Sequence, residues 1–142
     1  LTLYSCGVTN SWNTVLIEDW GMFKIPPNWT ASTENGYIYI YSKENGEEKL
    51  VMVQYLNSQW QVNEYFSDIE DMVCLESVTY GNSATFSKEE ILYKDGSVNR
   101  RCVLEILYLS EDHCAKFICV DDSIPEKTLR KITLTFVTAN DA

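Results

Sequence analysis

The sequence predicts an α+β domain with a single antiparallel β-sheet of about six strands and two packed helices. Asn45-Gly46 and Asp95-Gly96 each separate two strand-like runs, and two other segments carry apolar residues at helical spacing. The chain has 142 residues, of which 45% are hydrophobic, which is sufficient for one globular domain with its own core. No apolar run approaches the ~20 residues that a membrane-spanning helix needs.

The N-terminal segment differs from the rest of the chain. Residues 1–15 are polar, and their apolar residues follow neither a helical nor a strand periodicity. We therefore expect a tether or signal-peptide remnant there, followed by a single domain over residues 16–142. Because the chain begins at Leu1, we expect that an upstream segment was removed. The run Leu3-Tyr4-Ser5-Cys6-Gly7 resembles a bacterial lipobox, although Tyr4 fits poorly. Cys6 is therefore the candidate lipid attachment site, and the alternative is an ordinary cysteine in a frayed terminus.

A hairpin is expected around Asn45-Gly46, because both residues tolerate the positive φ angles of a two-residue turn. Its strands cover 37–42 and 49–55. The apolar face of this hairpin is the expected core face, and the opposite face carries a row of tyrosines. The turn pairs Ile38 with Val53 and Ile40 with Val51 on the core face, and Tyr37 with Gln54, Tyr39 with Met52 and Tyr41 with Leu50 on the other.

Further strands precede and follow this hairpin. A short strand is expected over 21–25 and ends at Pro26-Pro27, because proline cannot donate to a ladder. Trp29 belongs to a second short strand. Later in the chain, two turn sequences divide a β-rich region into a meander of three strands. These strands are expected over 87–93, 98–109 and 114–120, with turns at 94–97 and 110–113.

Two segments are predicted to be helices. The first covers 62–73, with Asn63 as its N-cap and an apolar stripe opposite an acidic face. The second starts at Ser123, with Pro125 in the first turn and Glu126 three residues after the serine, which predicts a capping box. Its end is ambiguous, because residues 132–137 alternate like a strand and also place apolar residues on one helical face.

The order of these elements resembles the PsbP-like and DcrB-like α+β domains found in small extracytoplasmic bacterial lipoproteins. The run from Trp20 to Trp29, with Gly21 after the tryptophan and Pro26-Pro27 before Asn28-Trp29, is similar to the opening of that family. The resemblance covers residues 14–138. It implies an antiparallel sheet covered by helices, favours a helix at the C-terminal end, and gives the lipobox a natural context. It implies no catalytic residue set.

The charge of the chain restricts its partners. Twenty-one acidic and 11 basic residues give a net charge of −10. Phosphate backbones require clustered cations, so we expect no nucleic-acid binding. The acidic surface leaves open an alternative function, a cytoplasmic immunity protein or secretion chaperone that binds a basic partner protein.

Catalytic and metal-binding patterns are weak. His113 is the single histidine, and it lies beside Cys114 in an expected turn, where adjacent side chains diverge. No C-x-x-C motif or Gly-rich phosphate loop is present. We therefore expect no enzymatic activity, no metal and no cofactor. Of the five cysteines, Cys102 and Cys119 are expected to share one face, and buried thiols are favoured over a disulfide.

The tyrosine row is the candidate binding surface of the sequence. Three aromatic side chains on one strand face can stack on a sugar or contact a protein, unless a helix covers them. We expect a non-enzymatic, monomeric binding or scaffold module of the cell envelope, anchored to the membrane only through lipid, with a protein or glycan partner at the cell surface. Its candidate binding residues are Tyr37, Tyr39, Tyr41 and Met52.

Overall fold

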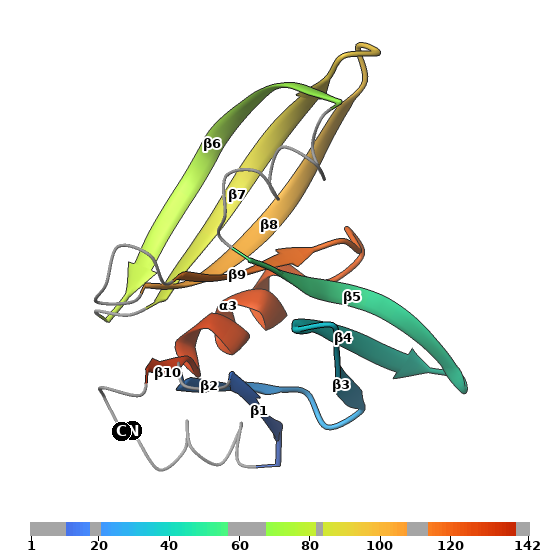
Figure 1. Ribbon diagram of the computed structural model, residues 1–142, viewed down its shortest axis with the longest axis vertical. Coiled ribbons are helices and arrows are strands. Elements are labelled where there is room, and N and C mark those ends of the chain that lie inside the picture. Colours follow the sequence, from blue (N-terminus) through green and yellow to red (C-terminus); the bar gives the residue numbers. More distant parts are fainter. Residues whose placement is uncertain (1–10, 18–20, 57–67, 82–83, 108–113, 139–142) are drawn as a thin grey trace.

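The computed structural model describes residues 11–17, 21–56, 68–81, 84–107 and 114–138. These residues form two antiparallel sheets and one helix, α3 (Figure 1). The small sheet has the order β1-β2-β10, and the large sheet has the order β3-β4-β5-β9-β8-β7-β6. The elements are β1 Asn13–Ile17, β2 Gly21–Ile25, β3 Trp29–Glu34, β4 Tyr37–Glu44, β5 Glu47–Leu56, β6 Ile69–Tyr80, β7 Ala84–Tyr93, β8 Val98–Leu107, β9 Cys114–Cys119, α3 Glu126–Leu134 and β10 Val137–Thr138.

The predicted fold class is wrong in both its sheet and its helix content. The described residues contain ten strands in two sheets rather than about six in one, so the structure is mostly β with a single helix. The physical reason for the second sheet lies at Pro26-Pro27. The prolines end β2 before it can continue into β3, and β2 instead pairs with β1 and β10 as a separate layer.

The helix expected over 62–73 is also wrong where the structure tests it. Residues 62–67 lie outside the described residues, and residues 69–73 belong to β6, which pairs with β7 along most of its length. The side chains of Met72 and Val73 are about half exposed, so the apolar spacing that predicted a helix does not correspond to a buried face. Pairing with β7 outweighs the weak helical preference of this segment.

The hairpin at Asn45-Gly46 is confirmed, with φ angles of 54° and 82°. The predicted pairing of Tyr41 with Leu50 is also confirmed. Beyond it, a β-bulge shifts the register by one residue, so that Ile40 pairs with Met52 rather than with Val51. Because the extra residue interrupts the alternation of β5, Val51 and Met52 are both fully buried.

The meander of three strands is confirmed as β7, β8 and β9, which are neighbours in the large sheet. The turn between β7 and β8 contains Gly96 at φ 89°, and the N–H of Tyr93 donates to the carbonyl oxygen of Ser97. The second predicted turn, at 110–113, lies outside the described residues. The strands expected over 21–25 and at Trp29 are confirmed as β2 and β3.

Helix α3 confirms the second predicted helix but not its capping box. Its N-cap is Pro125, which provides no side-chain hydrogen bond, while the Ser123 hydroxyl donates to Asp121 instead. The structure divides residues 132–137, whose state was ambiguous, between a helix and a strand. The helix continues to Leu134, and the chain then enters β10 at Val137.

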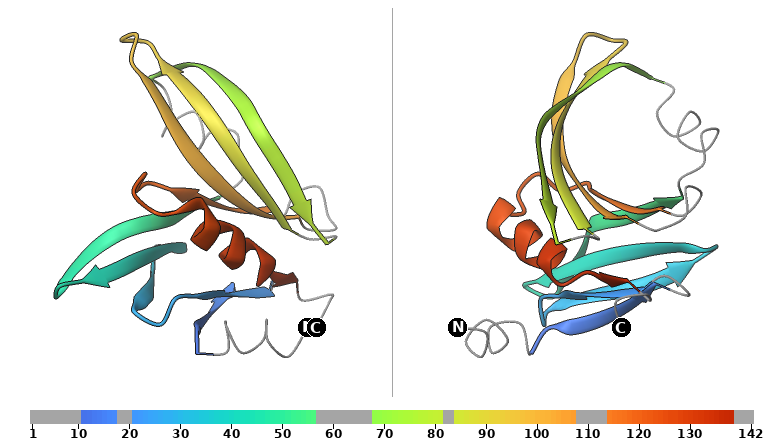
Figure 2. Two further views of the ribbon diagram at one scale, coloured as in Figure 1. Left: turned by 180° about the vertical axis from the view of Figure 1, so that it is seen from behind. Right: turned by 90° about the vertical axis from the view of Figure 1, so that its left-hand side faces the viewer.

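The hydrophobic core lies between the two sheets, with α3 along one side (Figure 2). Helix α3 contacts β7 and β8 of the large sheet and β2 of the small sheet. Phe23 of β2 and Phe117 of β9 are fully buried and meet edge to face, with ring centroids 4.8 Å apart. Phe136, just after α3, contacts Phe23 at 4.9 Å. Three aromatic rings therefore connect the small sheet, the large sheet and the C-terminal segment.

Strand β1 packs the first described residues against this core. Val15 and Ile17 are buried, and the side-chain amide of Asn13 donates to the carbonyl oxygens of Pro27 and Trp29. The expected boundary between residues 15 and 16 falls inside this strand. Within the described ranges, no helix has the length and apolarity to cross a membrane.

Candidate functional site

Strand β9 changes its neighbours along its length, and this creates an opening in the large sheet. Its ladder with β8 ends at Val103 and Ile118, whereas its ladder with β5 continues through Cys119. The N–H of Val120 then donates to the carbonyl oxygen of Val51 in β5, at 3.0 Å. Beyond this point β8 and β9 diverge (Figure 1). We call the opening between β8 and the residues that end and follow β9 the fork.

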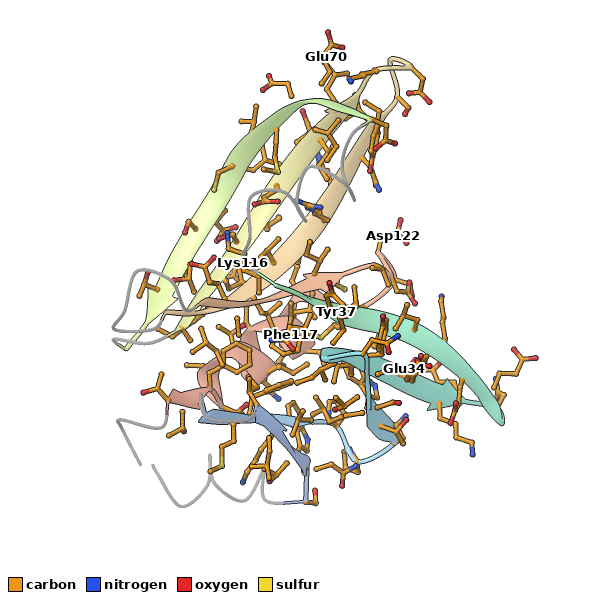
Figure 3. All side chains as sticks on the ribbon, in the orientation of Figure 1. Glu34, Tyr37, Glu70, Lys116, Phe117 and Asp122 are labelled. Atoms are coloured by element: carbon orange, nitrogen blue, oxygen red, sulfur yellow. The ribbon has the colours of Figure 1, made fainter. Side chains whose placement is uncertain are left out.

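A pocket of about 500 Å³ occupies the fork. One side is formed by residues 99–102 of β8, and the other by residues 118–122. Helix α3 contributes Glu126 and Leu129, and the lining also includes residues of β6 and β7 (75, 88, 91 and 93). Asp122 lies in the segment that follows β9 (Figure 3). The pocket therefore combines charged groups with an apolar wall, as small-ligand and peptide sites do.

Ion pairs attach α3 beside the pocket. The Lys88 ammonium lies 2.7 Å from the Glu126 carboxylate, and Arg130 lies 2.6 Å from Glu76. The Arg130 guanidinium also stacks over the Phe86 ring, 4.4 Å from its centroid. The hydrogen bond from Lys88 lowers the pKa of Glu126, and the same bond raises the pKa of Lys88. Both groups are therefore held in their charged forms at neutral pH.

Asp121 forms the base of the loop that leads from β9 to α3. Its carboxylate lies 2.6 Å from the Lys49 ammonium and accepts hydrogen bonds from the N–H and the hydroxyl of Ser123. Burial would raise the pKa of this carboxyl, but the hydrogen bonds from Lys49 and Ser123 outweigh that effect. Its pKa therefore lies below the ordinary value of 3.8.

Two free thiols lie where the fork begins. Cys102 is half-buried and Cys119 is buried, and both contact the hydrophobic core. The thiol of Cys119 donates to the carbonyl oxygen of Asp121 at 3.2 Å. Burial raises the pKa of both thiols, that of Cys119 to about 11. The prediction of buried thiols is confirmed for Cys119, whereas Cys74 is exposed and also free.

Replacing Asp121 with asparagine is expected to lower the free energy of unfolding by about 1 kcal/mol near pH 7, because the amide accepts hydrogen bonds less strongly than the carboxylate. The folded pKa is lowered, so this stability is complete above the ordinary value of 3.8 and is lost as the pH falls through the folded pKa. The difference between wild type and variant should therefore shrink as the pH falls below 3.8. Urea unfolding across this range measures it.

The matched control for this prediction is Asp122→Asn. Asp122 is exposed, and it forms no ion pair with any residue of the described ranges. Its replacement should lower the unfolding midpoint less than Asp121→Asn does near pH 7. A destabilisation by Asp121→Asn that stays constant down to about pH 2 would contradict the role of the ionised carboxylate.

The candidate binding residues that the sequence predicted do not line the fork pocket. Tyr37, Tyr39 and Tyr41 share the face of β4 opposite its buried residues, and all three are half-buried. Figure 3 labels the first of them, Tyr37. Met52 does not lie with them, because the bulge in β5 places it in the core opposite Ile40. Cys6 and His113 lie outside the described residues.

Sequence reasoning did not identify the fork. The expectation that Cys102 and Cys119 share one face of the sheet is the single sequence signal for this region. The separation of β8 from β9 depends on the pairing of β9 with β5, a contact between distant parts of the chain. No local motif of either strand indicates that pairing.

In comparisons with known proteins, the chain matches no family model and no curated protein. The resemblance to PsbP-like and DcrB-like domains therefore stays a prediction from the sequence. Function must be inferred from the geometry and charge of the fork.

Proposed function

We propose that the protein is a non-enzymatic binding module of the bacterial cell envelope, and that the fork pocket is its ligand site. The observation that supports binding is a pocket of about 500 Å³ at the large sheet, lined by residues of β6, β7, β8 and β9, by the segment after β9 and by α3. Rigid strands hold such a pocket open before the ligand arrives, which lowers the entropic cost of binding.

The titration behaviour of the pocket supports binding rather than catalysis. A general acid or base works best when its pKa lies near the working pH. In the fork pocket, each shift moves the pKa of its group further from 7. The carboxyl pKa values of Asp121 and Glu126 are lowered, and the thiol pKa values of Cys102 and Cys119 are raised. These groups stay in one protonation state near pH 7.

The envelope part of the proposal depends on Cys6, which the sequence places in a lipobox-like run. Labelling the full-length gene product with an alkyne fatty acid tests it. Label that disappears in Cys6→Ala would support a lipid anchor, and the absence of label in the wild type would overturn it. We propose that the module acts as a monomer.

Ligand binding in the fork is tested by backbone amide NMR with three ligand sets: short peptides, oligosaccharides and fatty acids. At least one set should shift the amide signals of Arg100, Cys102 and Val120. Val120 is 48% exposed at the pocket, so Val120→Trp should fill the opening without unfolding the protein and should abolish the shifts.

Leu16→Trp is the matched control, because Leu16 is 70% exposed on β1, far from the fork in the fold. This variant should keep the binding that the wild type shows. If no ligand set shifts the fork signals, or if Val120→Trp binds as well as the wild type, the fork is not the ligand site and the proposed function fails.

A further inference from the structure

We propose that Cys102 and Cys119 form a redox-active pair, which a low-molecular-weight disulfide oxidises to a bridge that joins β8 to β9 and closes the fork. Both thiols are free in the structure. The bridge can form whether or not the fork binds a ligand, and only its effect on ligand binding rests on the proposed function. The extracytoplasmic location that this function implies is an oxidising environment.

The two cysteines occupy the first position at which β8 and β9 are no longer paired. The last ladder pair is Val103 with Ile118, and one further step along each strand leads to Cys102 and Cys119. One step covers about 3.3 Å, so the strands diverge over the length of a single residue. Opposite residues of antiparallel strands have Cα atoms about 4.5 to 5.5 Å apart, and a disulfide joins Cα atoms about 4.4 to 6.8 Å apart. Bridging therefore needs only a small movement of the strand ends.

The side chains of both cysteines lie on the core face of the large sheet. Leu104 and Phe117 form a ladder pair, are fully buried, and each lie two residues from one of the cysteines. Side chains two residues apart in a strand share a face, so Cys102 and Cys119 lie on this face too. The packing agrees, because Cys119 belongs to the core cluster and Cys102 packs against it. Opposite positions on one face are what the geometry of a disulfide requires.

Electrostatic coupling between the two thiols supports their proximity independently of the register. Burial is the largest cause that raises the pKa of Cys119 to about 11, and the negative charge of an ionised Cys102 also raises it. A charge acts in this way only on a nearby group. Both residues also line the fork pocket, which gives a small oxidant access to the pair.

The two thiols differ in exposure, and this difference defines which of them reacts first. Cys102 is half-buried, whereas Cys119 is buried. Burial and the charge of Glu126 raise the pKa of Cys102, and Lys88, opposite it on β7, partly offsets them. Because an accessible thiolate is the nucleophile in thiol–disulfide exchange, Cys102 attacks the oxidant and Cys119 then resolves the mixed disulfide.

Two exchange steps convert the dithiol to the bridge. In the first step, Cys102 loses its proton and its sulfur attacks the oxidant, whose S–S bond breaks. One half of the oxidant leaves and takes up a proton, while the other half stays on Cys102. In the second step, the Cys119 thiolate attacks the Cys102 sulfur, and the second half leaves as a thiol. The protein thereby gives up two electrons and two protons, and the oxidant is reduced to two thiols.

Oxidation changes the contacts at the point where the fork begins. In the reduced protein, the Cys119 thiol donates to the carbonyl oxygen of Asp121 at 3.2 Å. The bridge removes this S–H and with it the hydrogen bond. The walls of the fork include residues 99–102 and 118–122, and each wall contains one of the two cysteines. A covalent bond between the walls therefore extends the paired part of the two strands and narrows the pocket.

Disulfide mapping tests whether the bridge forms. The full-length wild type is incubated with oxidised glutathione, digested and analysed by mass spectrometry. We expect a peptide pair joined through Cys102 and Cys119, and dithiothreitol should restore both thiols. Cys74→Ser is the matched control, because Cys74 is exposed and free, and this variant should form the same bridge. A bridge between two other cysteines, or no bridge, would overturn the proposal.

Single variants test the order of the two steps. Cys119→Ala lacks the resolving thiol and should keep one glutathione on Cys102, whereas Cys102→Ser should take up at least about tenfold less glutathione on Cys119. In the wild type, glutathione should appear on Cys102 before the bridge forms, which tests the same order without a substitution in the core. Equal uptake by the two variants, or first attachment at Cys119, would overturn this order.

Amide hydrogen exchange measures the closing of the fork. Val120 donates its N–H to β5, so the N–H of Cys119, one residue earlier, points toward β8. In a ladder extended by one pair, Cys102 and Cys119 donate to each other's carbonyl oxygens. Oxidation should therefore slow the exchange of both amides at least about tenfold and leave the amides of β1 unchanged. Unchanged exchange at both cysteines in the bridged protein would overturn the closing of the fork.

The effect on binding is measured with the same short peptides, oligosaccharides and fatty acids. A set that shifts the fork signals of the reduced protein should bind the oxidised protein at least about tenfold more weakly. Equal affinity for the two forms would overturn control of the ligand site by the bridge. If no set binds the reduced protein, the proposed function fails, and the bridge is decided by the disulfide map and the hydrogen exchange.

Discussion

Replacing Phe117 with alanine is expected to lower the free energy of unfolding by about 4 kcal/mol, because the ring is large and the cavity that it leaves cannot collapse easily. Phe117 is fully buried in β9, with its ring centroid 4.8 Å from that of Phe23 and 6.1 Å from that of Phe136. The ring thus joins the large sheet to the small sheet and to the segment after α3. Urea unfolding followed by circular dichroism measures the change.

Two variants control for this result. Phe117→Leu keeps most of the side-chain volume and should cost less than about half as much as the alanine variant. Leu134→Ala removes a leucine side chain from a residue that is 61% exposed on α3, and it should change stability by less than about 0.5 kcal/mol. If Phe117→Ala cost no more than Leu134→Ala, the two sheets would not share one core.

The Phe117→Ala variant also tests whether the two sheets unfold cooperatively. If the two sheets unfold as one unit, a cavity at their junction lowers the stability of both together, and the variant keeps a single transition. A second transition in Phe117→Ala would instead show that the small sheet can detach from the large one.

Local turn chemistry was the most predictable part of the fold. Asn45-Gly46 defines the turn between β4 and β5, with both residues at positive φ. The same dipeptide at Asn35-Gly36 has φ angles of 53° and 83° and joins β3 to β4. It carries the same signal in the sequence, and applying the rule there would have predicted the partner of β3.

Hydrophobic periodicity gave a wrong prediction in β6, where the apolar side chains are only partly buried. A helical spacing of apolar residues predicts a helix only when those residues face a core. In β6 the side chains of Met72, Val73 and Leu75 are each about half exposed, so their spacing reports no buried face. The alternation of β5 fails for a different reason, because the bulge buries Val51 and Met52 in succession.

The candidate site was the least predictable part, because it depends on which strands become neighbours. The fork exists only because β9 leaves β8 at Ile118 and continues along β5. That choice is made by contacts far apart in sequence, such as Met52 opposite Cys119. The sequence predicts each strand separately, but it contains no local signal for the point at which two of them separate.

Replacing Gly21 with alanine is the second change with a large expected effect. Gly21 begins β2 and lies opposite Thr138 of β10. A Cβ atom on this residue would lie 2.0 Å from the carbonyl oxygen of Val137 and 2.9 Å from the Cα of Thr138. Both are backbone atoms that cannot rotate away, so β10 must move off β2. We expect a loss of about 3 kcal/mol in the free energy of unfolding, measured by urea unfolding.

Gly36→Ala separates this steric effect from the general cost of replacing a glycine. Gly36 has a φ of 83°, and no atom lies within 4 Å of the position that its Cβ would take. The variant should therefore cost only the conformational penalty, about 1 kcal/mol. Equal losses for the two variants would mean that β10 does not lie against β2. A larger loss for Gly21→Ala would support the close approach that closes the small sheet over Phe23.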